Sequence, residues 1–117
     1  MVLCCVDDLM FSSKIVAAAR GTGTALQFVR RPDEVLARVR ELQPSLVILD
    51  LDAGRLRPVE TIAAIKADPA LAGIPTLAYV SHVRTDLITA ARAAGADEVL
   101  ARSAFTGRLG ELLAGRA

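Results

Sequence analysis

Four aspartates stand at or just after the ends of two apolar runs of the sequence. The segment LVILDLDAG, residues 46–54, carries its apolar run into Asp50 and continues to Asp52, and the segment MVLCCVDD ends in Asp7 and Asp8. An acid at the end of a buried strand either marks where the chain leaves the core or is placed there to react. A carboxylate in such a position can bind a metal ion or attack an electrophile.

Carboxylates that share one pocket need a positive charge. Two like charges about 4 Å apart repel by about 1 kcal/mol in water and about 4 kcal/mol at an effective dielectric of 20. Mg²⁺ prefers oxygen ligands and is often held by one or two carboxylates together with a phosphate. A carboxylate beside such an ion can act as a nucleophile toward phosphorus. Asp7, Asp8 and Asp50 are therefore candidates for a magnesium-dependent phosphoryl site.

A hydroxyl and a cation end two further apolar runs. Ser81 follows the run that ends in YVSH, and Arg102 follows the run that ends in VLAR. The Ser81 hydroxyl can donate a hydrogen bond to a phosphoryl oxygen, and the Arg102 guanidinium can neutralise phosphoryl charge. Together the four segment ends offer an acid pair, an acid, a hydroxyl and a cation.

Five short apolar runs, at residues 2–6, 25–29, 46–50, 75–80 and 98–101, are typical of strands covered on both faces. The segments between and after them have helical spacing. The second begins at Pro32 and Asp33, and the fourth ends at Gly95. Their apolar faces are Ile15, Val16 and Ala19; Val35, Leu36, Val39 and Leu42; Val59, Ile62 and Ala63; Leu87, Ala90, Ala91 and Ala94; and Phe105, Leu109, Leu112 and Leu113.

This alternation predicts a flavodoxin-like (βα)5 α/β fold, a doubly wound five-stranded parallel sheet with strand order 2-1-3-4-5. In such a sheet the site lies beyond the carboxyl ends of the strands, where the strand order reverses. That point lies between the first and third strands, which are about 4.8 Å apart. We therefore expect Asp7, Asp8 and Asp50 to surround one pocket.

Length and composition indicate one folded domain over residues 1–117. The sequence is 53% hydrophobic and 23% charged, which fits a soluble globular protein rather than a disordered chain. No apolar run approaches the roughly 20 residues that span a bilayer, and the acidic N-terminal segment is unlike a signal peptide. A cytoplasmic protein that does not act at a membrane is expected.

Charge and cysteine content exclude further classes of function. The formal net charge is +1, and the basic residues are scattered, so we do not expect nucleic acid as the main partner. Cys4 and Cys5 are adjacent in a predicted strand and point to opposite faces. A disulfide between them is therefore not expected, and a two-thiol metal site lacks companion ligands. We interpret both as buried and reduced.

On these motifs the sequence resembles, over essentially its whole length, the receiver domain of bacterial two-component response regulators. The resemblance implies that Asp50 is the phosphoacceptor and that Asp7 and Asp8 form the acid pair after the first strand. It also implies that Ser81 is the hydroxyl residue that ends the fourth strand. Mg²⁺ would be held by Asp8, Asp50 and the backbone carbonyl of Asp52, and by Asp7 through a water molecule.

The same resemblance implies the partners. A histidine kinase donates the phosphoryl group, and an unidentified target protein binds the face built from the fourth helix, fifth strand and fifth helix. A weak homodimer through this face is a further hypothesis. The chain is then a signalling protein rather than an enzyme, and no output domain is expected within its 117 residues.

Three features depart from the receiver pattern. Arg102 and Ser103 stand where the family has Lys-Pro, and arginine is a rigid, permanently charged fork rather than a compact ammonium group. Val99 stands where the family usually has a switch aromatic residue. The loop that follows Asp50, LDAGRLRP, lacks the usual Met-Pro. The acid residues thus match the family, whereas the residues that respond to the phosphate differ.

Other functions remain as alternatives. A phosphorylation-independent pseudo-receiver would keep the fold as a docking module. The motif around Asp50 and Asp52 also fits the hydrophobic-D-x-D motif of haloacid dehalogenase-like phosphatases, although little chain remains for their other catalytic segments. The segment RGTGTAL, residues 20–26, follows a helix instead of preceding one, so it indicates a turn rather than a phosphate-binding loop. His82 has no companion ligands, and we interpret it as a surface residue.

Overall fold

The computed structural model describes residues 1–81 and 84–115, so His82 lies outside the described residues. Five parallel strands form one sheet in the order β2-β1-β3-β4-β5, which confirms the predicted topology. The strands are β1 (Val2–Cys5), β2 (Leu26–Phe28), β3 (Leu46–Asp50), β4 (Thr76–Val80) and β5 (Glu98–Ala101). Each lies within one of the five apolar runs of the sequence.

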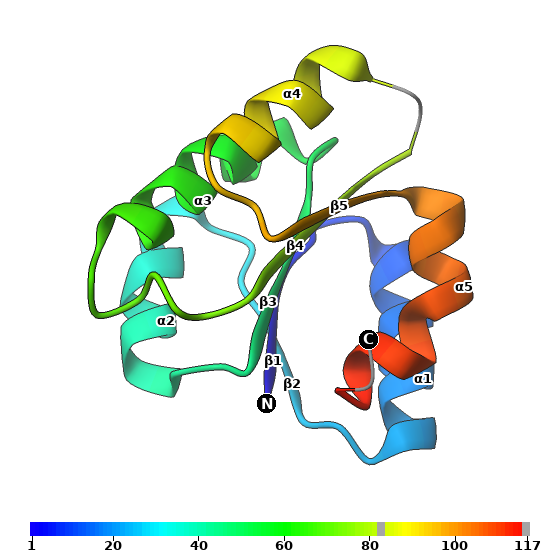
Figure 1. Ribbon diagram of the computed structural model, residues 1–117. Coiled ribbons are helices and arrows are strands. Elements are labelled where there is room, and N and C mark those ends of the chain that lie inside the picture. The colour runs from blue at the N-terminus through cyan, green and yellow to red at the C-terminus, as the bar shows by residue number, and fades with distance from the viewer. Residues whose placement is uncertain (82–83, 116–117) are drawn as a thin grey trace.

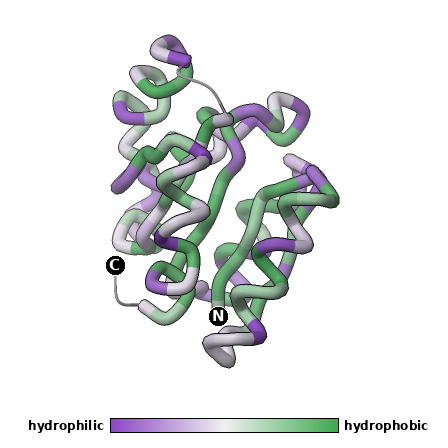
Figure 2. Tube along the Cα trace, turned by 90° about the vertical axis from the view of Figure 1, so that its right-hand side faces the viewer, coloured by the Kyte–Doolittle hydropathy of each residue, from purple (hydrophilic) through white to green (hydrophobic). Residues whose placement is uncertain are grey.

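Helices cover both faces of the sheet (Figure 1). One face carries α1 (Leu9–Thr22) and α5 (Arg102–Leu113), and the other carries α2 (Val35–Leu42), α3 (Pro58–Ala67) and α4 (Thr85–Ala93). The predicted start of the second helix at Pro32 is a 3₁₀ turn, Pro32–Glu34, which leads directly into α2. Figure 2 shows the hydrophobic strands in the middle, between helices of mixed hydropathy.

The core therefore has two halves, one on each side of the sheet. Adjacent strand residues alternate between them, and Cys4 packs on the α1–α5 side whereas Cys5 packs on the α2–α3–α4 side. Both cysteines are buried and free, and burial raises the pKa of each thiol to about 12. The interpretation of both residues as buried and reduced is confirmed.

The α1–α5 half contains a stack of three aromatic rings. The Tyr79 ring lies 4.5 Å from the Phe105 ring and 4.9 Å from the Phe11 ring, measured between centroids. The three residues come from β4, α5 and α1. This stack fills the space beneath the carboxyl ends of the central strands and thereby positions the first turns of α1 and α5.

Gly95→Ala is expected to lower the free energy of unfolding by about 1–3 kcal/mol, because the backbone here suits only glycine. Gly95 ends the fourth helical segment with φ at 104°, and an added Cβ would lie 3.0 Å from Cγ of Lys66. Lys66 cannot move freely, since its Nζ donates to the Ile74 carbonyl and to Asp97. Urea unfolding checks the result.

Gly107→Ala is the matched control for this prediction. Gly107 lies inside α5, and among residues 1–81 and 84–115 no atom beyond its chain neighbours and its own helix backbone lies within 4 Å of a Cβ added there. Alanine is favoured over glycine in a helix interior by about 1 kcal/mol, so this variant should be as stable as the parent chain or more so. Equal losses in both variants would contradict the assignment of strain to Gly95.

Candidate functional site

Asp50 is a buried carboxylate at the carboxyl end of the sheet. It is the last residue of β3, it pairs with Tyr79 of β4, and it is only 2% exposed. Its Oδ1 accepts a hydrogen bond from the Asp52 amide at 2.9 Å, and its Oδ2 lies 3.7 Å from a terminal nitrogen of Arg102. The strand end thus fixes the backbone of Asp50, and two partners orient its carboxylate.

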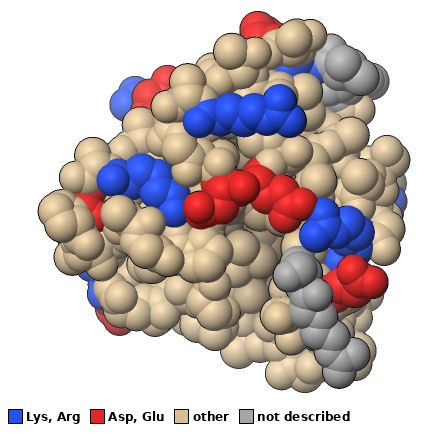
Figure 3. Space-filling view, in the orientation of Figure 1, with Lys and Arg blue, Asp and Glu red and all other residues tan. Residues whose placement is uncertain are grey.

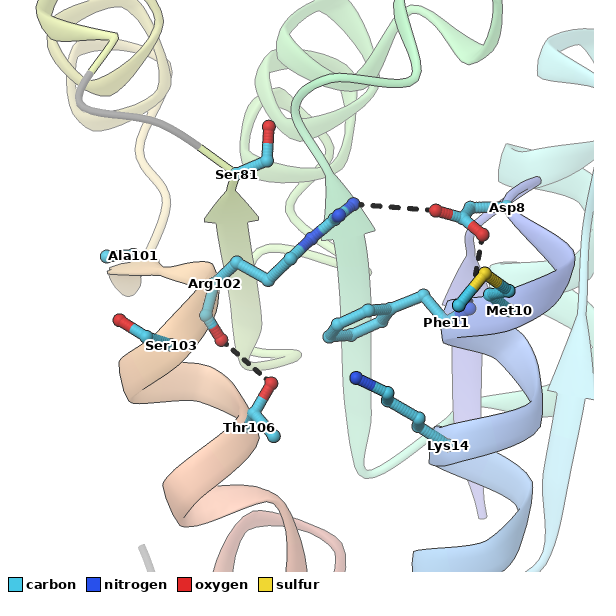
Figure 4. Close-up of a pocket in the computed structure, with 9 residues that line it drawn as sticks. All are labelled: Asp8, Met10, Phe11, Lys14, Ser81, Ala101, Arg102, Ser103 and Thr106. Atoms are coloured by element: carbon cyan, nitrogen blue, oxygen red, sulfur yellow. Dashed lines mark hydrogen bonds and ion pairs between the residues drawn. The ribbon is translucent and has the colours of Figure 1, made fainter.

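Arg102 joins two carboxylates through one terminal nitrogen. This residue begins α5 immediately after β5, and its Nη2 lies 3.7 Å from Asp8 Oδ2 as well as 3.7 Å from Asp50 Oδ2. Figure 4 shows the side chain extending from α5 toward Asp8 at the start of α1. The guanidinium also lies over the aromatic stack, 4.7 Å from the Phe11 ring centroid and 5.8 Å from that of Tyr79.

The two acids that follow β1, Asp7 and Asp8, have different partners. Asp8 caps α1, because its Oδ1 accepts a hydrogen bond from the Phe11 amide at 3.1 Å while its Oδ2 faces Arg102. Asp7 instead pairs with Arg55, whose Nη2 lies 3.3 Å from Asp7 Oδ2. The structure therefore brings Asp8 and Asp50 to one cation and gives Asp7 a different one.

The expected cluster of three carboxylates around one divalent ion is not formed. Within residues 1–81 and 84–115, no group of three or more His, Cys, Asp or Glu side chains is arranged to hold a metal ion. Asp8 and Asp50 are chemically suitable, since carboxylate oxygens are the ligands that Mg²⁺ prefers. The obstacle is Arg102, whose guanidinium lies close to both carboxylates. This arrangement does not fit a divalent ion while Arg102 stays in place.

Burial dominates the ionisation of Asp50. It raises the pKa of this carboxyl from 3.8 to about 6, although the hydrogen bond from the Asp52 amide and the charge of Arg102 act in the opposite direction. The charges of Asp52 and Asp7 raise the pKa further. Asp50 is thus ionised, and able to act as a nucleophile, mainly above pH 6.

Asp52 connects the loops that follow β3 and β4. Its Oδ2 accepts a hydrogen bond from the Ser81 amide at 2.6 Å. Burial acts to raise the pKa of Asp52, but hydrogen bonds from the Ser81 hydroxyl and amide outweigh it and hold the pKa below its ordinary value. The receiver resemblance implies a role for the backbone carbonyl of Asp52, so this contact of its side chain was missed. That carbonyl's part in a metal site stays a prediction.

An open pocket of about 770 Å³ lies between the first turns of α1 and α5. Asp8, Ser81, Arg102 and Ser103 line it, so four of the residues singled out in the sequence share this space. Lys14 and Phe11 of α1 also line it and were missed. Their positions in the sequence, one and two helical turns after the acid pair, could have indicated that they lie on the same side of the helix as the site.

Arg55 was also missed. It lies in the loop LDAGRLRP, which had been noted only for the Met-Pro that it lacks. The exposed Arg55 side chain reaches back to Asp7 across the carboxyl end of the sheet. Two arginines in the site thus each contact an acid of the pair that follows β1.

Charges on the face shown in Figure 3 are interspersed, with a row of acidic side chains between basic ones. Lys66 pairs with Asp97, just before β5, and Arg108 pairs with Glu98, the first residue of β5. This face does not present the continuous basic surface that attracts phosphate backbones.

In the part of the chain that the structure describes, no helix has both the length and the apolar character needed to cross a bilayer.

This fold is that of response-regulator receiver domains. A response regulator from Hahella chejuensis matches with a TM-score of 0.84 at 24% identity, over 96% of this chain and 90% of its own. The phosphorylated cyanobacterial phytochrome response regulator RcpA matches with a TM-score of 0.78 at 22% identity, over 97% and 88%. The Mn²⁺-bound form of response regulator Rcp1 gives 0.77 at 21%, over 97% and 88%. Neither family models nor curated proteins give a match.

Proposed function

We propose that this chain is a receiver module that accepts a phosphoryl group on Asp50 from a histidine kinase and signals through protein contacts. The observation that carries the proposal is the placement of Asp50. Its buried carboxylate ends the central strand of a receiver fold and faces the Arg102 guanidinium, and Ser81 lines the neighbouring pocket. The phosphorylated state of the structural neighbour RcpA supports this use of the fold.

The chemistry is a transfer between two nucleophiles. An ionised oxygen of Asp50 attacks the phosphorus of the kinase phosphohistidine and forms a new O–P bond. The bond from phosphorus to the imidazole nitrogen breaks, and its electron pair stays on the imidazole. Arg102 lies where it can offset negative charge on the phosphoryl oxygens, and the Ser81 hydroxyl can turn from Asp52 to donate to one of them.

A Mg²⁺ ion at Asp8, Asp50 and the Asp52 carbonyl remains part of the hypothesis. When bound, it would supply positive charge to the phosphoryl oxygens. The Mn²⁺-bound form of Rcp1 supports divalent-ion binding within this fold. Asp7 would contribute through a water molecule. We assign no step to the ion, because Arg102 contacts two of its three proposed direct ligands.

The signal is proposed to leave through the face built from α4, β5 and α5. Arg102 stands at the junction of β5 and α5, so a change in its position would change the positions of both elements. The proposed occupant of this face is the target protein, with a second copy of the chain as the homodimer hypothesis. Sedimentation with and without a phosphoryl mimic distinguishes the two.

A docking module that never takes a phosphate is the second candidate. The observation that favours it is the Arg102 bridge, which already balances Asp8 and Asp50 without any ligand. In this case the fold would present a fixed surface, and the site would hold it in one state.

Treatment with acetyl phosphate and Mg²⁺ is expected to add one phosphoryl group to the chain and none to Asp50→Asn, measured by intact mass spectrometry. Asp33→Asn is the matched control, because Asp33 is exposed and pairs with Arg31 on the surface. Beryllofluoride should shift the amide resonances of Asp50, Ser81 and Arg102 in the parent chain. An unmodified mass together with unchanged spectra would favour the docking module, and hydrolysis of para-nitrophenyl phosphate would favour the phosphatase.

A further inference from the structure

Arg102 lies where a shared cation between Asp8 and Asp50 is needed. One terminal nitrogen is 3.7 Å from a carboxylate oxygen of each. Asp50 is almost fully buried, and a buried carboxylate needs a nearby positive charge or it takes up a proton. The guanidinium supplies this charge from within the chain.

The aromatic stack holds the guanidinium in this position. Arg102 lies over the rings of Phe11 and Tyr79, at 4.7 Å and 5.8 Å from their centroids. Its Nε is buried and has no hydrogen-bond partner within the described chain, so the side chain is held by the rings and the two acids rather than by a hydrogen-bonded fork. Such packing favours arginine over a more strongly hydrated ammonium group.

A divalent ion that used the same carboxylate oxygens would lie next to this guanidinium. The guanidinium and the divalent ion would then repel each other strongly, because the cleft is partly buried. Only one of the two cations is therefore expected to occupy this position. The guanidinium has the advantage of its covalent attachment, which gives it a high effective concentration at the two acids. A free ion must compete against that concentration.

We propose that Arg102 is a tethered counterion that takes the place of a divalent cation between Asp8 and Asp50, so that the guanidinium and the ion exclude each other there. The resting chain therefore binds divalent ions weakly. Removing the guanidinium leaves two carboxylates without a shared cation and creates a divalent-ion site. This inference concerns the unphosphorylated chain and does not depend on the proposed phosphoryl transfer.

The test uses Mn²⁺ as the probe ion with metal-free protein and no phosphodonor. Free Mn²⁺ is followed by electron paramagnetic resonance, and the site is located by paramagnetic broadening of the amide resonances of Asp8 and Asp50. We expect Arg102→Gln to bind one Mn²⁺ at least tenfold more tightly than the parent chain. The double variant Arg102→Gln/Asp50→Asn should lose this gain.

Two further variants keep the test decisive. Arg102→Met keeps an unbranched chain over the aromatic rings without the charge, so it should show the same gain even if the glutamine variant folds poorly. Arg108 lies in the same helix as Arg102, and its guanidinium pairs with Glu98. The Arg108→Gln variant should therefore bind Mn²⁺ like the parent chain. In the folded variants, Mg²⁺ should raise the melting temperature of Arg102→Gln or Arg102→Met more than that of the parent chain.

Equal Mn²⁺ affinities for the parent chain and the Arg102 variants would overturn the proposal. So would the absence of a site in folded Arg102→Met, because the two acids would then not form a cation site at all. Neither result depends on whether Asp50 accepts a phosphoryl group, so failure here and failure of the proposed function are distinguishable.

Discussion

Asp50→Asn is expected to raise the free energy of unfolding by about 2–3 kcal/mol at pH 7.5 and by less than about 1 kcal/mol at pH 4. The substitution keeps the shape of the side chain and removes its charge. Its effect on stability therefore measures what it costs the fold to keep this buried carboxylate ionised.

The pH dependence follows from the direction of the pKa shift. Burial raises the pKa of Asp50 from 3.8 to about 6, so between these values the folded chain binds more protons than the unfolded chain. Stability then falls as the pH rises from about 4 to about 6, and the loss is complete above the folded pKa. Asparagine resembles the protonated side chain and avoids this loss.

Urea unfolding at the two pH values, in the presence of a chelator, measures the difference. Asp33→Asn is again the control, because an exposed acid should change stability by no more than about 0.5 kcal/mol at either pH. An Asp50→Asn chain that is less stable than the parent chain at pH 7.5 would mean that Arg102 contributes more to the carboxylate than burial removes.

On this expectation, the ionised Asp50 carboxylate lowers the stability of the fold at neutral pH. An asparagine at this position could keep the shape of the side chain and accept the hydrogen bond from the Asp52 amide without the charge, so the acid is best explained by chemistry. The proposed phosphoryl transfer requires an ionised oxygen at this position. Arg102 reduces the cost without removing it, since the pKa stays raised despite its charge.

The strands and their order could be predicted because they depend on short-range patterns. Apolar runs such as residues 46–50 locate strands that are covered on both faces, and the βα alternation then leaves few topologies. The same logic placed Ser81 and Arg102 beside the acids, since all follow carboxyl ends of parallel strands.

The partners of each side chain in the site could not be predicted in this way. Arginine side chains are long, and periodicity does not say which acid each one reaches. Arg55 therefore takes Asp7, and Arg102 takes Asp8 and Asp50, where a metal ion had been expected. The hydrogen bond from the Ser81 amide to Asp52 likewise depends on loop conformation, which apolar spacing does not determine.

The aromatic stack was hidden for a different reason. Phe105 was expected in the core from its helical spacing, which is confirmed by its complete burial. Its contacts with Tyr79 and Phe11 join segments that are far apart in the sequence. Such contacts can be predicted only when the positions of the helices on the sheet are known.

Phe105→Ala is expected to lower the free energy of unfolding by about 3–5 kcal/mol, because it removes a fully buried ring and leaves a cavity. The Phe105 ring lies nearly parallel to that of Tyr79, with 4.5 Å between centroids and 5° between planes. Stacked pairs contribute about 0.5–1.5 kcal/mol beyond the burial of their area. Urea unfolding at pH 7.5 measures the loss.

Phe28→Ala is the matched control, since Phe28 is only partly buried on β2 and packs at the margin of the same half of the core. Its loss should be at most about half that of Phe105→Ala, because less apolar area returns to water. The Tyr79 ring that Phe105 supports also lies under Arg102, so Phe105→Ala should loosen the guanidinium as well as the core. A small loss in Phe105→Ala, similar to that in Phe28→Ala, would show that the aromatic stack adds little to the stability of the fold.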